Sequence, residues 1–345
     1  MRADPTASPA LDPVSLRPAV FAVGAAAGLL VDALLGDPRR GHPVAAFGRA
    51  AAGVEQALWR DHRGWGALHT LLCAGGTAGG VALAARAVRG RPAAATALTA
   101  AAVWAVVGGT TLGREARAIG GALDAGDLEV ARERLPHLCG RDPQALDGPA
   151  MARAVVESVA ENTSDAVVGA LVWGALAGVP GLAGFRAVNT LDAMVGHKSP
   201  RYRRFGWASA RLDDLAGWPG ARLTALLAAA MGGDPAGAVR AWRADAHRHP
   251  SPNAGPVEAA FAGALGVRLG GTLSYGGRVE HRPVLNEDGR AVQTADIERA
   301  VRLSRRVSLG ALAVCAGGRL AVAAARTRHK SGRPTARGRR KAGTA

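Results

Sequence analysis

Long apolar stretches alternate with polar connections along most of this chain. They are rich in Ala, Gly, Val and Leu, and two of them, 65–85 and 92–112, reach the roughly 20 residues that a helix needs to cross hydrocarbon. Alternation with the period of a β-strand is nearly absent. The pattern predicts an all-α, polytopic integral membrane protein with about 4–6 apolar segments and polar connections that form the site. The apolar segments are 19–35, 65–85, 92–112, 167–184, 218–233 and 307–325.

Two of these segments are weak as membrane spans. Residues 218–233 form a short segment, and residues 167–184 are interrupted by Val179-Pro180-Gly181. Proline and glycine bend or end a helix. Each of the two segments can therefore be re-entrant, interfacial or a core helix.

One large domain is expected between two polar ends. Residues 1–18 carry four prolines and no apolar period, which predicts a disordered leader. Asp32 interrupts the segment 19–35 and no small-x-small cleavage site follows, so a retained helix is favoured over a signal peptide. Residues 19–325 are expected to form a single membrane-embedded catalytic domain, and residues 326–345 a basic disordered tail.

Charge and cysteine content exclude some functions. The formal net charge is +16, carried almost entirely by Arg and concentrated in the tail. No stacking-aromatic motif or zinc-finger spacing accompanies this charge, so we expect no nucleic-acid partner. We expect instead that the tail contacts anionic lipid. The three cysteines form no CxxC pair, so neither a disulfide nor a zinc site is indicated.

The densest group of polar side chains lies at 157–165. Glu157, Glu161 and Asp165 follow one another at i, i+4 and i+8 of a predicted helix, with Asn162 beside them. Carboxylates at this spacing repel each other, whereas Mg²⁺ favours one or two carboxylates with waters and phosphate oxygens. The group is a candidate metal and base site. The alternative is a solvated acidic face that ends in a helix cap.

A second polar group follows the broken segment. Asn189 and Asp192 stand at i and i+3 of a predicted helix, which suits a second metal or amide contact. Lys198 is the single lysine before the tail in a chain that otherwise uses Arg. A compact, mobile ammonium suits contact with a phosphate, and the alternative is chance retention.

Three further groups are weaker alone. Asp213 and Asp214 follow Arg211 at an expected helix end, where both carboxylates can reach one ion, although acidic pairs are common. The prolines around Ser251 and before Asn253 fix an extended backbone that presents both side chains. Residues 269–277, which contain two Gly-Gly pairs and Tyr275, predict a flexible loop that is neither a P-loop nor a dinucleotide fingerprint.

Taken in order, these groups resemble the CobD/CbiB family of cobalamin biosynthesis proteins. The resemblance covers about residues 20–325, and several motifs in one order make it far more specific than any single motif. The motifs are Asp32-x4-Asp37-Pro38 with His42-Pro43; Arg153-x3-Glu157-Ser158-x2-Glu161-Asn162-x-Ser164-Asp165; Asn189-Thr190-Leu191-Asp192-Ala193-Met194; Arg201-Tyr202 with Phe205-Gly206; Ala210-Arg211-x-Asp213-Asp214; His249-Pro250-Ser251-Pro252-Asn253-Ala254-Gly255; and the glycine-rich stretch 263–277.

The resemblance implies a multi-span inner-membrane enzyme, a carbon–nitrogen ligase that uses ATP and Mg²⁺. Such an enzyme attaches (R)-1-amino-2-propanol, or its O-phosphate, to one propionate carboxylate of adenosylcobyric acid. The product is adenosylcobinamide or its phosphate. Association with other membrane enzymes of the late cobalamin pathway is a further expectation.

Roles follow from the resemblance and from residue chemistry together. The expected catalytic residues are Glu157, Glu161, Asp165, Asp192 and Lys198. The expected metal ligands are Glu161, Asp165, Asp213 and Asp214. Contacts to substrate are expected from Arg211, Ser251, Asn253, Tyr275, Asn162 and Asn189.

The expected topology follows from the location of the substrates. ATP and the corrin are cytoplasmic, so the polar groups should share one side, which favours about four true spans with re-entrant or buried helices. The basic tail would then lie outside, against the positive-inside tendency. Two other functions compete: a non-catalytic corrin-binding membrane scaffold, and a transporter that uses intramembrane Asp32 but shows no inverted halves.

Overall fold

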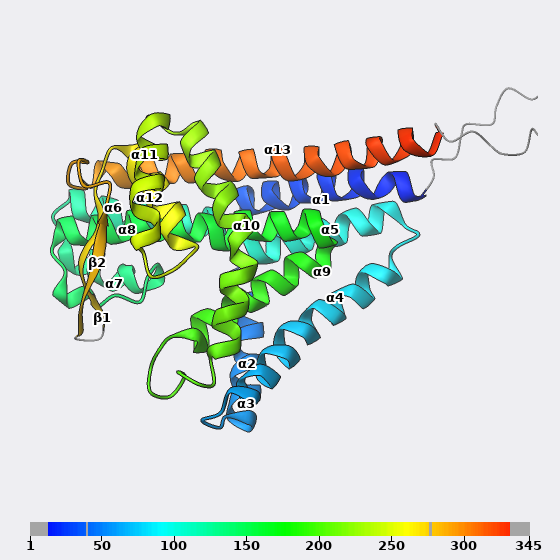
Figure 1. The fold of residues 1–345 in the computed structure, drawn as a ribbon, viewed down its shortest axis with the longest axis horizontal. Coiled ribbons are helices and arrows are strands. Elements are labelled where there is room, and N and C mark those ends of the chain that lie inside the picture. Colours follow the sequence, from blue (N-terminus) through cyan, green and yellow to red (C-terminus); the bar gives the residue numbers. More distant parts are fainter. Residues whose placement is uncertain (1–12, 39–40, 276–277, 332–345) are drawn as a thin grey trace, which may run out of the picture.

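A computed structural model describes residues 13–38, 41–275 and 278–331, which are mostly helical (Figure 1). The longer helices are α1 (Pro13–Leu35), α2 (Pro43–Leu58), α3 (Arg63–Thr70), α4 (Gly76–Ala87), α5 (Pro92–Val107), α6 (Gly109–Asp124), α7 (Leu128–Arg134), α8 (Gly148–Asn162), α9 (Gly169–Leu191), α10 (Trp207–Met231), α11 (Pro235–Asp245), α12 (Ala254–Leu265) and α13 (Ala295–Ser331). Two strands, β1 (Leu269–Tyr275) and β2 (Arg278–Leu285), pair antiparallel.

The molecule has two unlike ends. At one end of Figure 1 lie the start of α1, the end of α13 and the turn between α4 and α5. The other end carries α6, α7, α8, α11, α12 and the hairpin, while α2 and α3 extend below. The long helices α1, α5 and α13 run between the two ends, as expected for membrane spans. We call this second end the polar end. Helix α12 is buried along its whole length, so it forms the centre of the polar end.

Helix α9 reverses direction in its middle. Gly178 has φ 71° and ψ −162°, a conformation that glycine adopts readily, and Pro180 follows it. A Cβ added to Gly174 would lie 3.5 Å from the Cβ of Leu182. In a straight helix these two positions would be about 12 Å apart. The arms 169–177 and 179–191 are therefore antiparallel, and α9 is a re-entrant helical hairpin.

Small residues allow this hairpin to pack tightly. A Cβ added to Gly169 would overlap the ring of Phe185 on the returning arm. A Cβ added to Gly220 of α10 would lie 2.8 Å from the Cα of Gly169. Close backbone approach at glycine is how helices associate where no hydrophobic effect drives them together.

Arg319 of α13 satisfies the backbone at the reversal. Its Nη1 donates to the carbonyl oxygens of Gly174 at 2.9 Å and Ala175 at 3.4 Å. These carbonyls belong to the last turn of the first arm, where a helix leaves acceptors unpaired and the dipole attracts a cation. The guanidinium also lies 5.0 Å from the centroid of the Phe21 ring. Arg319 therefore supplies the partners that lipid cannot.

The predicted all-α membrane fold is confirmed. Five segments are long and apolar enough to cross a membrane: Pro18–Leu35, Arg63–Ala87, Pro92–Asp124, Gly148–Gly196 and Ala295–Arg328. Because Gly148–Gly196 contains the reversal, four segments are left to run from end to end. The weak segment 218–233 lies in α10 and is not among the five.

Several boundaries differ from the prediction. Helix α1 begins at Pro13, within the expected leader, and α13 continues to Ser331, past the expected start of the tail. Residues 1–12 and 332–345 lie outside the described residues. The expected flexible loop at 269–277 is a β-hairpin along its described part, with a register shift between Leu269 and Gly271. The glycines hid the strand, since Gly270 and Gly271 both have positive φ.

The reversal makes a testable prediction about sidedness. In a variant whose native cysteines are replaced, single cysteines at Glu129 and Arg203 should react with an impermeant maleimide from the same side of the membrane. Both residues are exposed and flank the hairpin in sequence. A cysteine at exposed Arg91, in the α4–α5 turn, should react from the opposite side. Labelling of positions 129 and 203 from opposite sides would mean that α9 crosses the membrane.

Candidate active site

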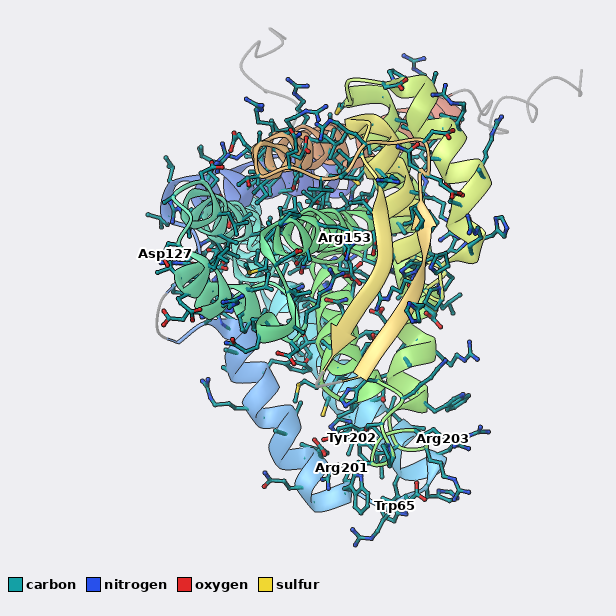
Figure 2. All side chains as sticks on the ribbon, turned by 90° about the vertical axis from the view of Figure 1, so that its left-hand side faces the viewer. Trp65, Asp127, Arg153, Arg201, Tyr202 and Arg203 are labelled. Atoms are coloured by element: carbon teal, nitrogen blue, oxygen red, sulfur yellow. The ribbon has the colours of Figure 1, made fainter. Side chains whose placement is uncertain are left out.

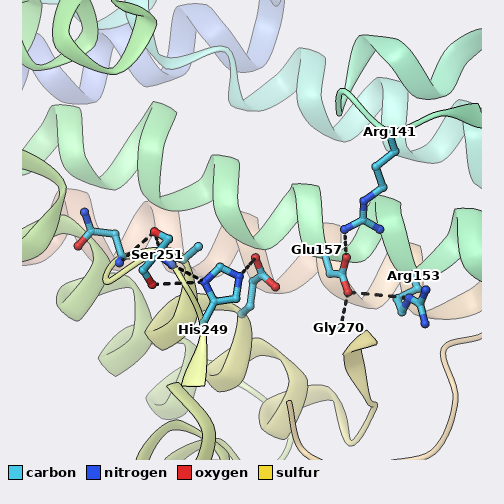
Figure 3. A network of polar contacts seen from close by, with 9 residues as sticks. Arg141, Arg153, Glu157, His249, Ser251 and Gly270 are labelled. Carbon is cyan, nitrogen blue, oxygen red and sulfur yellow. Dashed lines mark hydrogen bonds and ion pairs between the residues drawn. The ribbon is translucent and has the colours of Figure 1, made fainter. Parts of the chain in front are cut away.

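Glu157 is the centre of a buried ion-pair network at the polar end (Figure 3). Its Oε2 pairs with the guanidinium of Arg141, and both side chains are almost fully buried. Its Oε1 accepts a hydrogen bond from the backbone N–H of Gly270 at 2.6 Å and lies 4.0 Å from Nε of Arg153. A carboxylate with these partners is committed to joining α8 to the β-hairpin and to the loop that carries Arg141.

A buried histidine–glutamate pair lies nearby in the same view (Figure 3). The backbone N–H of Ser251 donates to Nδ1 of His249 at 3.0 Å, so the ring proton sits on Nε2, 3.8 Å from Oε1 of Glu258. Burial, followed by the charges of Glu157 and Glu161, raises the pKa of Glu258 well above its ordinary value. Burial, followed by the charge of Arg282, lowers the pKa of His249. Both shifts favour the uncharged forms of the two side chains.

The helical geometry changes where the acidic group continues. Helix α8 ends at Asn162 and a π-helical segment, η4 (Thr163–Val168), follows, so Asp165 does not follow Glu161 at α-helical spacing. Glu161 is exposed and Asp165 is half-buried. Asp192 begins another π-helical segment, η5 (Asp192–Gly196). Wide turns of this kind are frequent at functional sites because they re-aim side chains.

The returning arm of α9 meets α10 through a chain of polar contacts. Nη1 of Arg186 donates to Oδ1 of Asn189 at 3.1 Å, and Nδ2 of Asn189 donates to Oδ1 of Asp213 at 3.4 Å. Arg186 also interacts electrostatically with Asp165 and Asp37. The arm therefore brings an amide and a cation to the carboxylates of η4 and α10.

Burial and neighbouring charges shift the pKa of Asp213. Burial, followed by the charge of Asp192, raises its pKa from 3.8 to about 7, and Asp214 and Glu161 act in the same direction. The hydrogen bond from Asn189 opposes this rise. Carboxylates from α8, η5 and α10 thus share one field, and we call Glu161, Asp165, Asp192, Asp213 and Asp214 the acidic cluster.

Ser251 and Asn253 shape the start of α12. The Oγ of Ser251 accepts from the backbone N–H groups of Asn253 at 3.3 Å and Ala254 at 3.1 Å. Nδ2 of Asn253 donates to the carbonyl of Asp214 at 2.9 Å, while its Oδ1 accepts from Nη1 of Arg222 at 3.1 Å. Both side chains therefore hold backbone in place beside the acidic cluster.

Another polar contact set lies at the start of α6. The backbone N–H of Thr110 donates to Oδ2 of buried Asp32 at 3.0 Å. The N–H of Asp37 donates to Oγ1 of Thr111 at 3.0 Å, and its Oδ1 lies 3.5 Å from Nε2 of His42. Asp32 is thus an acceptor for an unpaired helix-start N–H, which explains its position without transport.

The remaining expected site residues are Lys198, Arg211, Asn162 and Tyr275. Lys198 is exposed and, within the described part of the chain, has no hydrogen bond or ion pair. Arg211 is exposed and lies 3.6 Å from Asp214. Nδ2 of Asn162 donates to the carbonyl and Oγ of Ser158, at 2.9 Å and 3.1 Å. The side chain of Tyr275 lies outside the described residues.

Sequence reasoning missed several partners of the acidic residues. His249 stood only within a motif, and Arg141, Glu258, Arg186 and Arg282 were not singled out. Figure 2 shows Arg153 beside the β-hairpin and, at the lower end, Arg201 and Tyr202. Both of these donate to Oε1 of buried Glu55, at 3.1 Å and 2.8 Å. For Arg186 and Glu55, the sequence offered one signal of a buried polar contact, which was a charged residue among the apolar residues of a helix.

The acidic cluster suits a cation held partly by substrate. Within residues 13–38, 41–275 and 278–331, no three His, Cys, Asp or Glu side chains converge as a ready-made metal cage. Mg²⁺ is usually bound by one or two carboxylates together with waters and phosphate oxygens. Glu161 and Asp165, or Asp213 and Asp214, can supply that many ligands. The donor chemistry therefore fits Mg²⁺ when a phosphate is present.

Comparison with known proteins defines the class. The family described as CobD/Cbib protein matches residues 25–304. Cobalamin biosynthesis protein CobD of Mycobacterium tuberculosis is 57% identical over 295 residues, which cover 84% of this chain and 93% of that protein. The protein of the same name from Chromobacterium violaceum is 44% identical, covering 81% and 90% of the two chains. No solved structure matches the chain.

The fold and the matches give one conclusion. This is a mostly helical, multi-pass membrane protein. The chain belongs to the CobD/Cbib family.

The raised pKa of Asp213 predicts a pH-dependent stability. The folded state keeps a proton on Asp213 up to about pH 7, whereas the unfolded chain loses it near pH 3.8, so this group lowers stability as pH rises between those values. Asp213→Asn should therefore raise the Tm more at pH 8 than at pH 5 when EDTA is present. Asp124→Asn, at an exposed position, is the matched control and should shift the Tm equally at both values. An equal shift for Asp213→Asn would contradict the assigned environment.

Proposed function

We propose that this chain acts in cobalamin biosynthesis as an ATP-dependent amide synthase of the inner membrane. It would join a propionate carboxylate of adenosylcobyric acid to (R)-1-amino-2-propanol or its O-phosphate, giving adenosylcobinamide or its phosphate. Membership of the CobD/Cbib family and the names of its relatives support the pathway. The residues of the acidic cluster support the reaction.

The observation that carries the proposal is the gathering of carboxylates from separate elements. Glu161 comes from α8, Asp192 from η5 and Asp213 from α10, and all three interact electrostatically. Unpaired like charges destabilise a fold, so such a cluster needs a cation when it functions. A bound Mg²⁺ would neutralise phosphate charge and orient the triphosphate of ATP.

Amide formation requires that the corrin carboxylate be activated. A carboxylate oxygen would attack a phosphorus of ATP, the bond to the leaving phosphate group would break, and an acyl phosphate would form. The amine nitrogen would then attack the acyl carbon, the C–O bond to phosphate would break, and the nitrogen would give up a proton. Asp213, whose pKa is raised to about 7 in the metal-free protein, would accept that proton while Glu161 and Asp165 hold the cation.

The remaining roles follow from placement. Glu161 and Asp165 would contribute to the metal site. Lys198 is exposed and uncommitted within the described residues, so it can reach a phosphate, with Arg211 beside Asp214 as a second cation. Glu157 would position the β-hairpin rather than react, because Arg141 and the Gly270 N–H already hold its two oxygens.

A corrin-binding scaffold is the second candidate. It would explain the membrane segments but not the acidic cluster together with Lys198. Turnover separates the two functions. Purified protein in nanodiscs should convert adenosylcobyric acid to a species heavier by one amide-linked amine, and only with ATP and Mg²⁺. Corrin binding without any mass gain, with either amine, would support the scaffold.

Point variants test the assigned roles. Glu161→Gln, Asp165→Asn and Lys198→Ala should each lower kcat/KM by about 10² or more, because each removes charge that stabilises the phosphoryl transition state. The matched control is Glu129→Gln, an exposed glutamate that pairs with Arg132 and should keep full activity. Unchanged product formation by all three variants would disprove the assigned site.

A further inference from the structure

A large cleft lies at the opposite end of the molecule from the acidic cluster. It has a volume of about 610 Å³, within the roughly 300–1,000 Å³ of small-molecule sites. Its walls come from α1, α4, α5, α9 and α13, and include Phe21, Leu83, Leu98 and Val179. The walls belong to candidate membrane segments, so an occupant would have to be apolar along most of its length.

The mouth of the cleft is basic. Arg86 and Arg89, at the end of α4 and in the turn to α5, line it and are exposed. Neither has a hydrogen bond or ion pair in the part of the chain that the structure describes. Arg319 also lines the cleft, but its guanidinium is held by the carbonyls of Gly174 and Ala175. Within the described residues, two unpaired guanidinium groups therefore lie at the mouth of a cleft whose interior is apolar.

We propose that this cleft binds one anionic phospholipid, with an acyl chain between α1, α4 and α5 and the phosphate at Arg86 and Arg89. Basic pockets between membrane helices bind anionic head groups by this combination of charge and apolar surface. Leu83 is 70% exposed beside the cleft, as expected for a lipid-facing wall. A soluble anion would use the two arginines and leave the apolar interior unfilled.

The same occupant would support the reversal of α9. Gly178, Val179 and Pro180 form part of the cleft wall, so an acyl chain would pack against the turn of the re-entrant hairpin. The hairpin carries Asp165 before its first arm and Asn189 on its second. Bound lipid should therefore stabilise the folded protein as well as occupy the cleft.

Native mass spectrometry in detergent tests the proposal, with phosphatidylglycerol and phosphatidylcholine as probes. The wild-type protein should retain one phosphatidylglycerol and bind phosphatidylcholine far more weakly. Each arginine near a phosphate is worth about fivefold in affinity, so Arg86→Gln combined with Arg89→Gln should weaken phosphatidylglycerol binding by roughly 30-fold. Arg91→Gln, in the same turn but outside the cleft lining, is the control and should change it little.

A second variant tests the apolar part of the site. Ala82→Phe adds a ring at an exposed position of the lining, keeps both arginines, and should weaken phosphatidylglycerol binding while the Tm without lipid stays the same. Equal binding of both lipids, or equal losses in the Arg86/Arg89 and Arg91 variants, would overturn the proposal. So would full competition by glycerol phosphate, which would mean that the head group binds without the cleft.

Discussion

The reversal of α9 at Gly178 is the constraint on which the arrangement of this molecule depends. A chain that turns inside a membrane leaves carbonyl groups that lipid cannot satisfy. Arg319 provides their partners from α13, and glycines at 169, 174 and 181 let the two arms touch. Because the second arm returns to the side from which the first one came, η4 and η5 end up at the same face of the molecule.

Carboxylates from several separate elements meet at that face. The two oxygens of Glu157 are held by Arg141 and by the N–H of Gly270, and the pKa shifts of Glu258 and His249 favour the uncharged form of each. The acidic cluster has weaker partners: Asn189 donates to Asp213 at 3.4 Å, Arg211 lies 3.6 Å from Asp214, and Arg186 acts on Asp165 from a distance. We propose that a divalent cation and a phosphate bound together would neutralise its remaining charge, which joins the electrostatics of the fold to the proposed use of ATP.

Much of the architecture could be predicted from the sequence, because apolar segments and their interruptions are local features. The break at Pro180 predicted a weak span with a re-entrant segment as one of three alternatives, and the motif order indicated the family. The sequence did not indicate that the carboxylate of Glu157 would already be paired, because its partner Arg141 comes from a separate loop. The β-hairpin was missed because Gly270 and Gly271 interrupt its side-chain alternation. Lys198 was predicted from composition, and its reach to a phosphate is still a prediction.

The most direct measurement is a disulfide between the two arms of α9. With the native cysteines replaced, Gly174→Cys and Leu182→Cys place two Cβ atoms about 3.5 Å apart, the separation of a native disulfide. Oxidation in membranes should join them within one chain, which a mass shift of two hydrogens would record. In a continuous helix the same positions would lie about 12 Å apart and could not be bridged. Failure to form this bond in folded protein would contradict the re-entrant hairpin.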